Sequence, residues 1–311
     1  MNRWMTNLPV ELKRKPLHKL CIPGSHDSGA YKLNVSLPVG HDQNYWKLLH
    51  QIAKIRGVKT IIKNWSETQT LSIKEQLNIG VRYFDLRIEL VEKPPFCSFD
   101  DIFAVHALYG ESVPSFLNDI KEFLDANKEE VVILDVNHIF RMSHVDFLHM
   151  FVIPLQELFG RDSFCPIMVD IADSTLEELV ETNHRLIVVG PYENQVMGIV
   201  YSNEYITSHW PNLNSIYDLI AFMRNEVNQK KPPVLNVLQG MMTARLSDII
   251  RNLFGNLRED FGLPSRKTTT DFINSLTFKE KDNVNIVITD EVDENFTKAV
   301  VKLNTMLPDE L

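Results

Sequence analysis

Short apolar segments alternate with amphipathic segments along nearly the whole chain of 311 residues. Several apolar segments have almost no polar interruption, which is typical of strands covered on both faces. They predict eight strands, at 19–24, 81–88, 103–108, 130–137, 184–190, 205–208, 233–239 and 284–290. Helical periodicity predicts helices at 72–80, 114–128, 144–160, 174–183, 214–229, 245–260 and 296–306.

Two local features refine the helix predictions. Ser72 and Glu75 have the spacing of a capping box, and Pro154 interrupts the pattern of 144–160. About eight strands alternating with helices predict an α/β fold. The strand count favours a (β/α)8 TIM-type barrel, a single domain over residues 1–311, and a doubly wound open sheet is the alternative.

Composition narrows the class of protein. A hydrophobic content of 44% and a charged content of 23% are ordinary for a soluble globular chain, and a net charge of −9 argues against a nucleic-acid partner. The three cysteines are scattered and form neither a metal-binding pair nor a disulfide framework. The first twenty residues lack the apolar run of a secretory signal, and no stretch is long enough to span a bilayer. We therefore expect a cytoplasmic protein.

Acid and base groups gather where the predicted strands end. The carboxyl ends of parallel barrel strands meet at one rim, and active sites are built there. Each of these residues taken singly is more often a solvated loop charge or a satisfied core histidine. Their recurrence after five strands favours a functional site, made of His26, Asp27, Asp85, Arg87, His106, Asp135, Asn137, His138 and Asp290.

The run Ser25-His26-Asp27 contains three residue types that are common in catalysis, side by side. They cannot form a Ser-His-Asp triad with one another, because successive side chains of extended chain point to opposite faces. The surrounding sequence fits neither a P-loop nor a nucleophile elbow. The run must therefore act together with distant residues.

Asp85 and Arg87 lie two positions apart on one predicted strand, so their side chains share a face. A guanidinium there presents a planar set of donors suited to phosphate oxygens. His26 and His106 could flank such a phosphate, one accepting a proton and the other giving one. The residues therefore predict phosphoryl transfer with two histidines and an arginine clamp.

Four segments, "IPGSHDS", "VRYFDLRI", "AVHALYG" and "EEVVILDVNH", resemble the X-box motifs of phosphatidylinositol-specific phospholipase C. The chain is most similar to the stand-alone X-domain-containing group of animals. The later segments "SHWPN" and "NIVITDEVD" extend the resemblance over nearly the whole sequence. The resemblance implies a distorted, incompletely closed (β/α)8 barrel.

The resemblance also implies roles for the central residues. His26 matches the general base that deprotonates the inositol 2-hydroxyl, and Asp290 the carboxylate that orients it, although Asp293 is also available. His106 matches the general acid, with Asp27 as its carboxylate partner. Arg87 stands where the bacterial enzymes have an arginine and the calcium-dependent enzymes an acidic ligand, which implies no metal and no cofactor.

The implied reaction converts phosphatidylinositol lipids to diacylglycerol and inositol 1,2-cyclic phosphate. By resemblance, Asp85 contacts Arg87 or the inositol. Asp135, Asn137 and His138 contact the inositol or support the site, and Trp210 stacks on the sugar. For His138, a hydrogen bond to backbone at the rim is an equally good interpretation.

Residues 31–71 form a long insertion after the first strand, at the predicted active-site rim. Residues 1–63 hold eleven Lys and Arg but only three acidic residues. Within 44–65, Trp46, Leu49, Ala53 and Trp65 alternate with Lys47, Lys54, Arg56, Lys59 and Lys63. This pattern suits transient docking on an anionic membrane, whereas the alternative is that the insertion packs on the barrel with solvated lysines. No obligate protein partner is implied.

Two other functions are alternatives to the phospholipase C. One is a catalytically idle phosphoinositide-binding or scaffold protein of the same fold, against which His26, Arg87 and His106 together argue. The other is a glycerophosphodiester phosphodiesterase, but that family has a different histidine motif and paired acidic metal ligands.

Overall fold

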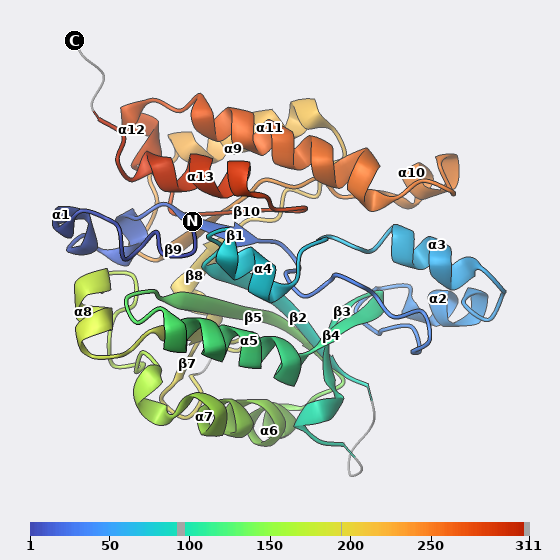
Figure 1. Cartoon of the computed structure of the whole chain (residues 1–311). Coiled ribbons are helices and arrows are strands. Elements are labelled where there is room, and N and C mark those ends of the chain that lie inside the picture. The colour runs from blue at the N-terminus through green and yellow to red at the C-terminus, as the bar shows by residue number, and fades with distance from the viewer. Residues whose placement is uncertain (92–96, 194, 308–311) are drawn as a thin grey trace.

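The computed structural model describes residues 1–91, 97–193 and 195–307. Among these residues, one sheet of ten strands forms the core of the fold, and eight of its strands run parallel to one another. The strand order is β7-β6-β5-β2-β1-β10-β9-β8 (Figure 1). β7 and β8 end this order, so the curled sheet stays open between them. The strands are β1 (Ile22–Ser25), β2 (Tyr83–Leu90), β5 (Val132–Phe140), β6 (Leu186–Val189), β7 (Val200–Tyr201), β8 (Ile206–Ser208), β9 (Leu235–Gln239) and β10 (Ile286–Thr289).

One predicted strand has a different place in the sheet. The prediction that 103–108 is a strand of the parallel barrel is wrong, because β3 (Ile102–His106) pairs antiparallel with β2 and with β4 (Leu108–Ser112). An apolar run cannot distinguish a hairpin from a barrel strand. The eighth parallel strand is instead β7, which has only two residues and gave no recognisable pattern.

The helices follow most of the predicted segments. Ser72 caps α4 in a complete capping box with Glu75, as the spacing predicted. The segment 144–160 divides into α6, a π-helical turn at Leu148–Val152 and α7, which has Pro154 in its first turn. The helices are α1 (Val10–Lys13), α2 (Trp46–Ile52), α3 (Val58–Asn64), α4 (Ile73–Asn78), α5 (Val113–Ala126), α6 (His144–Phe147), α7 (Ile153–Phe159), α8 (Leu176–Glu181), α9 (Ile216–Asn228), α10 (Leu246–Arg251), α11 (Leu263–Asn274), α12 (Phe278–Lys281) and α13 (Glu294–Leu303).

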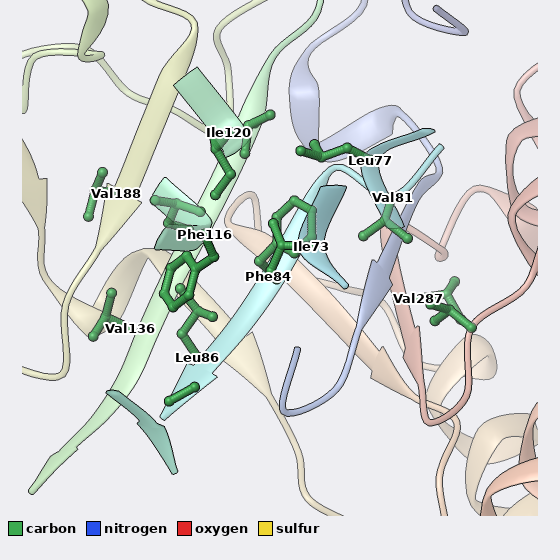
Figure 2. Close-up of a cluster of buried hydrophobic side chains, with 14 of the residues drawn as sticks. Ile73, Leu77, Val81, Phe84, Leu86, Phe116, Ile120, Val136, Val188 and Val287 are labelled. Carbon is green, nitrogen blue, oxygen red and sulfur yellow. The ribbon is translucent and has the colours of Figure 1, made fainter. Parts of the chain in front are cut away.

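The helices cover the outside of the curled sheet. Helices α5, α6 and α7 lie on one side of it and α9, α11 and α13 on the other (Figure 1). Under α4 and α5, Phe84 and Leu86 of β2 pack with Ile73 and Phe116 in a buried cluster (Figure 2). Burial of such aromatic and aliphatic side chains is the main stabilisation of the barrel wall.

A fully buried ion pair lies before the first residues of β2 and β5. Both Nε and Nη2 of Arg82 lie 2.8 Å from Oε2 of Glu130, and both side chains are inaccessible to solvent. Oε1 of Glu130 accepts bonds from the backbone N–H and hydroxyl of Thr6. This pair therefore fastens the N-terminal segment to the end of the sheet opposite the carboxyl rim.

The insertion folds into α2 and α3 and packs on the barrel. Leu49 and Ala53 lie against a small buried cluster that includes Val39 and Ile62, and Trp65 is buried. The packing alternative is therefore correct for these apolar residues. Among the described residues, no helix has the length and apolar character needed to cross a bilayer.

Candidate active site

Two neighbouring side chains, His26 and Asp27, meet just after β1. Asp27 has a left-handed backbone conformation, with φ of 38°, which an L-residue with a Cβ adopts at some cost. This conformation turns the chain, so that Nε2 of His26 lies 3.4 Å from Oδ2 of Asp27. The sequence argument assumed extended backbone here, and the turn at Asp27 is the reason why the two side chains converge instead of diverging.

Asp27 is the centre of the site. Its Oδ1 lies 2.7 Å from Nε of Arg87, and its Oδ2 lies 3.6 Å from Nε2 of His106. The carboxylate is 1% exposed. Three cationic or protonatable groups, one just after β1 and the others on β2 and β3, thus contact one buried carboxylate. The sequence left Asp85 to contact either Arg87 or the inositol, and in the structure the ion pair of Arg87 is with Asp27.

Asp290 contacts the second ring nitrogen of His26. Its Oδ1 lies 2.7 Å from Nδ1 of His26. Asp293, the alternative left open by the sequence, caps α13 through the N–H of Phe296 and faces Arg266. The geometry therefore assigns the contact with His26 to Asp290.

Charge and burial shift the ionisation of this cluster. Burial alone would lower the pKa of His26, but the charges of Asp27, Asp290 and Asp85 outweigh it and raise the pKa to about 9. Burial disfavours the ionised form of Asp27, yet Arg87 and the two histidines lower its pKa to about 2. Asp27 is therefore an anion at neutral pH, and His26 is mostly protonated when no substrate is bound.

His106 approaches from the end of β3. Its Nδ1 lies 2.8 Å from the carbonyl oxygen of Ser66, so that nitrogen donates and Nε2 faces Asp27. The ring is partly exposed, with 19% of the side chain accessible. His26 and His106 therefore face the same carboxylate from two sides, and both remain reachable from solvent.

The remaining polar residues of β2 and β5 adjoin this cluster. Asp85 accepts hydrogen bonds from the backbone N–H of Asp27 and from the amide of Asn137, whose oxygen contacts Nδ1 of His138. Burial and the charge of Asp27 raise the pKa of Asp85. Asp135 accepts from the hydroxyl of Tyr83, and burial together with the charge of Asp85 raises its pKa to about 7.

Trp210 is not drawn into the cluster. It follows β8, is 58% exposed, and donates its indole N–H to Oγ1 of Thr243. A cavity of about 420 Å³ lies between the insertion and the segment around Arg258, with Glu67 and Glu291 in its lining. None of the six clustered residues His26, Asp27, Asp85, Arg87, His106 and Asp290 lines it, so this cavity is separate from the cluster.

Three residues of the cluster have the donor types of a metal site. One ligand atom each from His26, Asp27 and Asp85 lies within 4.8 Å of the others. However, the guanidinium of Arg87 already contacts Asp27, and a protonated His26 cannot ligate a cation. The cluster as folded therefore fits an anion beside Arg87 better than a divalent cation between the carboxylates.

Sequence reasoning missed several residues that support the site. Gln69 donates to the carbonyl oxygens of His26 and Thr289, and its own oxygen accepts from the N–H of Val292. Asp42 accepts from the N–H of Ala107, next to His106. Both lie in the insertion or just before α4, where no strand end marks them, so the sequence contains no periodic pattern that would have identified them.

Comparisons with known proteins agree with this architecture. A family model described as PI-PLC X 1 matches residues 61–243. The chain is 33% identical over 312 residues to the mouse PI-PLC X domain-containing protein 2, covering 98% of this chain and 88% of that protein. It is 34% identical to the human protein of the same name, over 82% of each chain.

Among solved structures, the fold is similar to phosphatidylinositol-specific phospholipase C from Listeria monocytogenes. The TM-score is 0.66 at 18% identity, over 98% of this chain and 99% of that one. A variant of the corresponding Staphylococcus aureus protein gives a TM-score of 0.60 at 15% identity, over 96% of each chain. At such identities the likeness concerns the fold, and it confirms the distorted TIM-type barrel. With the family model matching more than half of its length, the chain belongs to the PI-PLC X-domain family.

Proposed function

We propose that this protein is a metal-independent phospholipase C that cleaves phosphatidylinositol-type lipids to diacylglycerol and inositol 1,2-cyclic phosphate. The observation that supports it is the convergence of His26, Arg87 and His106 on the single carboxylate of Asp27. An idle lipid-binding pocket has no need of two histidines on opposite sides of one anion. The family and the fold agree with a protein of the phospholipase type.

In the proposed first half of the step, His26 is the general base. Its neutral form removes the proton of the inositol 2-hydroxyl, and the 2-oxygen attacks the phosphorus of the same molecule. Asp290 fixes the ring through Nδ1, which leaves Nε2 as the basic nitrogen. Because nucleophile and phosphorus belong to one lipid, proximity is supplied by the substrate.

In the proposed second half, the bond between phosphorus and the glycerol oxygen breaks. His106 gives its Nε2 proton to that oxygen, which leaves as the hydroxyl of diacylglycerol. Oδ2 of Asp27 lies 3.6 Å from this nitrogen, on the side of the ring from which the proton is given. The proton taken by His26 and the proton given by His106 balance, so the catalyst returns to its starting charge after one proton exchange with water.

Arg87 is proposed to bind the phosphate. Its Nε contacts Asp27, the carboxylate that both histidines also approach, and its side chain is 25% exposed. Fixed positive charge at this place stabilises the extra negative charge of the pentacoordinate phosphorus without a divalent ion. The contact of Arg87 with Asp27 makes this cation part of the folded site.

Asp85, Asp135, Asn137 and His138 are proposed to bind the inositol ring. Asp85 and Asp135 are buried on neighbouring strands, and Asn137 links Asp85 to the exposed His138. Burial and the nearby Arg87 lower the pKa of His138, so its ring is neutral and can both donate and accept. Trp210 is proposed as an exposed stacking surface further along the rim.

The proposed lipid substrate requires that the rim meets a membrane. The insertion after β1 and helix α10 after β9 both emerge at the carboxyl rim, and both lie at the right of Figure 1. α10 and the residues after it expose Leu246, Ile250 and Phe254, the last at 89%. On the insertion, Lys54 and Arg56 are exposed beside Ile55. Apolar side chains next to basic ones suit an anionic lipid surface.

Measuring turnover and membrane binding in the same experiment distinguishes the proposed enzyme from a catalytically idle scaffold. Vesicles of phosphatidylinositol are incubated with wild type, His26→Ala and His106→Ala in chelator, and diacylglycerol release is measured beside vesicle sedimentation. If the protein is a phospholipase C, only the wild type should release diacylglycerol, and all three proteins should sediment with the vesicles. Binding without release by wild type would favour the scaffold.

A further inference from the structure

The residue after His106 is held on both sides by the insertion. The backbone N–H of Ala107 lies 3.0 Å from each carboxylate oxygen of Asp42. The carbonyl oxygen of Ala107 accepts the N–H of Gly40 at 2.8 Å. Both backbone groups of Ala107 are thus bonded to one short segment, residues 40–42, which we call the clamp.

Ala107 needs such support because of its backbone conformation. Its φ is 58°, in the left-handed region that residues with a Cβ rarely adopt. A strained residue persists only where its surroundings fix it. The two bonds from the clamp fix it here. The bond to its N–H also fixes the plane of the peptide that joins it to His106, and so the backbone from which the His106 ring extends.

The clamp is itself anchored to β2 by a buried carboxylate. Glu89, whose side chain is inaccessible to solvent, accepts from the backbone N–H of His41 at 2.8 Å and from its Nδ1 at 2.6 Å. The hydroxyl of Tyr109 donates to the same carboxylate at 2.7 Å. These charge-assisted bonds make residues 40–42 a fixed part of the barrel wall.

Glycine at position 40 is required by the close approach of the clamp. A Cβ on Gly40 would lie 2.4 Å from Cγ2 of Val105, one residue before His106. No other residue type allows the backbone of the clamp so near to β3. Residues 40–42 therefore contact the residues on both sides of His106.

We propose that Asp42 is a positioning residue for His106, holding its imidazole at the leaving oxygen of the lipid. This inference rests on the proposed function. The ring is also held by the bond of its Nδ1 to the carbonyl oxygen of Ser66. Loss of the Asp42 carboxylate frees the N–H of Ala107, and the ring then samples orientations in which Nε2 no longer faces Asp27.

The chemistry of the leaving group gives this role a specific readout. The glycerol alkoxide of the lipid needs a proton from His106 as the bond to phosphorus breaks. A 4-nitrophenolate leaves as a stable anion and needs none. A residue that acts through His106 therefore affects the lipid much more than an inositol phosphodiester with a nitrophenyl leaving group, whereas a residue that only stabilises the fold affects both alike.

The experiment compares both substrates in Asp42→Ala, Asp42→Asn and Asp146→Ala. Asp146 is a matched control, because its carboxylate also accepts a backbone N–H, that of Ser143 at the start of α6. Since a general acid contributes about 10²–10⁴-fold, we expect Asp42→Ala to lower kcat on the lipid by roughly 10–100-fold. We expect less than about a threefold loss on the nitrophenyl substrate, and recovery to within about fivefold on the lipid in Asp42→Asn, whose amide oxygen still accepts.

A second readout needs no turnover. The imidazole NMR signals of His106 are followed in the same variants without substrate, with those of His26 as the internal reference. Asp42→Ala is expected to shift the His106 signals and to leave those of His26 in place. Equal loss on both substrates, or unchanged His106 signals, would overturn the inference. A wild type inert on both substrates, with His106 signals that still shift in Asp42→Ala, would instead reject the proposed function and leave the positioning role standing.

Discussion

Nδ1 of His26 lies 2.7 Å from Oδ1 of Asp290, although 264 positions separate the two residues in the chain. β1 and β10 are neighbours in the sheet, and their parallel register brings both strand ends to the same point of the rim. The contact fixes the ring of His26 with Nε2 toward Asp27. It also distinguishes Asp290 from Asp293, which lies only three residues further along the chain.

Asp290→Asn tests this orientation. The amide removes the negative charge and disfavours the tautomer with its proton on Nδ1, so we expect kcat to fall by roughly 10²–10⁴-fold. Asp293→Asn is the matched control, because asparagine caps a helix as well as aspartate does, and it should change kcat by less than about twofold. Steady-state kinetics on phosphatidylinositol vesicles measure both. A larger loss in Asp293→Asn would reverse the assignment.

The pKa of His26 predicts the pH profile. A base must be neutral, and the acidic groups facing His26 raise its pKa to about 9. kcat/KM should therefore rise about tenfold per pH unit from pH 6 toward 9, because each unit increases the neutral fraction tenfold. The profile is measured in His106→Ala with the nitrophenyl substrate, which needs no general acid. The decrease in rate at high pH that deprotonation of His106 would cause is then absent. An ascending limb centred near pH 6.5 would contradict the charge environment described for His26.

Asp27→Asn should shift the rising part of the pH profile to lower pH. Asp27 is the strongest of the charges that raise the pKa of His26, so its neutralisation lowers this pKa toward the ordinary value of about 6.5. Titration of the His26 imidazole by NMR measures the shift directly, independent of turnover. An unchanged His26 titration in Asp27→Asn would show that the charge of Asp27 does not set this pKa.

Arg87 predicts indifference to metal removal. If the guanidinium supplies the charge at the phosphate, a chelator leaves kcat unchanged, and Arg87→Ala lowers it by roughly 10³-fold, comparable to removal of another preorganised charge. Added guanidinium should restore part of the activity of Arg87→Ala. Activity that is lost in chelator and restored by calcium would assign the charge to a cation held by His26, Asp27 and Asp85 instead.

The buried pair of Arg82 and Glu130 predicts a large effect on stability. Glu130→Ala leaves an unpaired buried guanidinium, and we expect the free energy of unfolding to fall by about 3–5 kcal/mol. Glu129→Ala is the control on the adjacent residue. Its partner Lys13 lies 2.8 Å away at the surface, and its loss should cost less than about 1 kcal/mol. Urea denaturation measures both, and equal losses would contradict the argument from burial.

The rim predicts where vesicle binding is sensitive to mutation. Ile250→Asp with Phe254→Asp, and separately Lys54→Glu with Arg56→Glu, should each weaken binding to anionic vesicles by at least about tenfold. Lys59 is left out, because its amine bonds the carbonyls of Val35 and Leu37 and its loss would disturb the insertion. Val10→Asp, on α1 at the opposite end in Figure 1, is the control. Unchanged binding at low salt in both rim variants would reject this surface.

Much of the fold could be predicted because buried strands have continuous apolar runs. The run "VVILDVN" predicted β5, and "VNIVITD" predicted β10. α11 was missed because its sequence is rich in threonine and charge, and its buried face includes only a few residues such as Ser265, Thr269 and Phe272. β3 was misplaced because its partner depends on the hairpin with β4, which a run of apolar letters does not specify.

The site could be predicted where its residues follow strands. His26, Arg87, His106 and Asp290 were identified from strand ends, but their mutual distances depend on the curl of the sheet. The centring of the cluster on Asp27 depends on one left-handed residue, and no sequence pattern specifies that conformation for an aspartate. Asp42 belongs to a loop, and only the folded path of the insertion brings it to Ala107.

The most direct test of the central claim is phosphorus NMR of the product formed from phosphatidylinositol vesicles in chelator. Attack by the inositol 2-hydroxyl, with proton transfer through His26 and His106, predicts the resonance of a five-membered cyclic phosphate in the wild type and none in His106→Ala. Formation of open-chain inositol phosphate from the start, or of no phosphate product at all, would contradict the account.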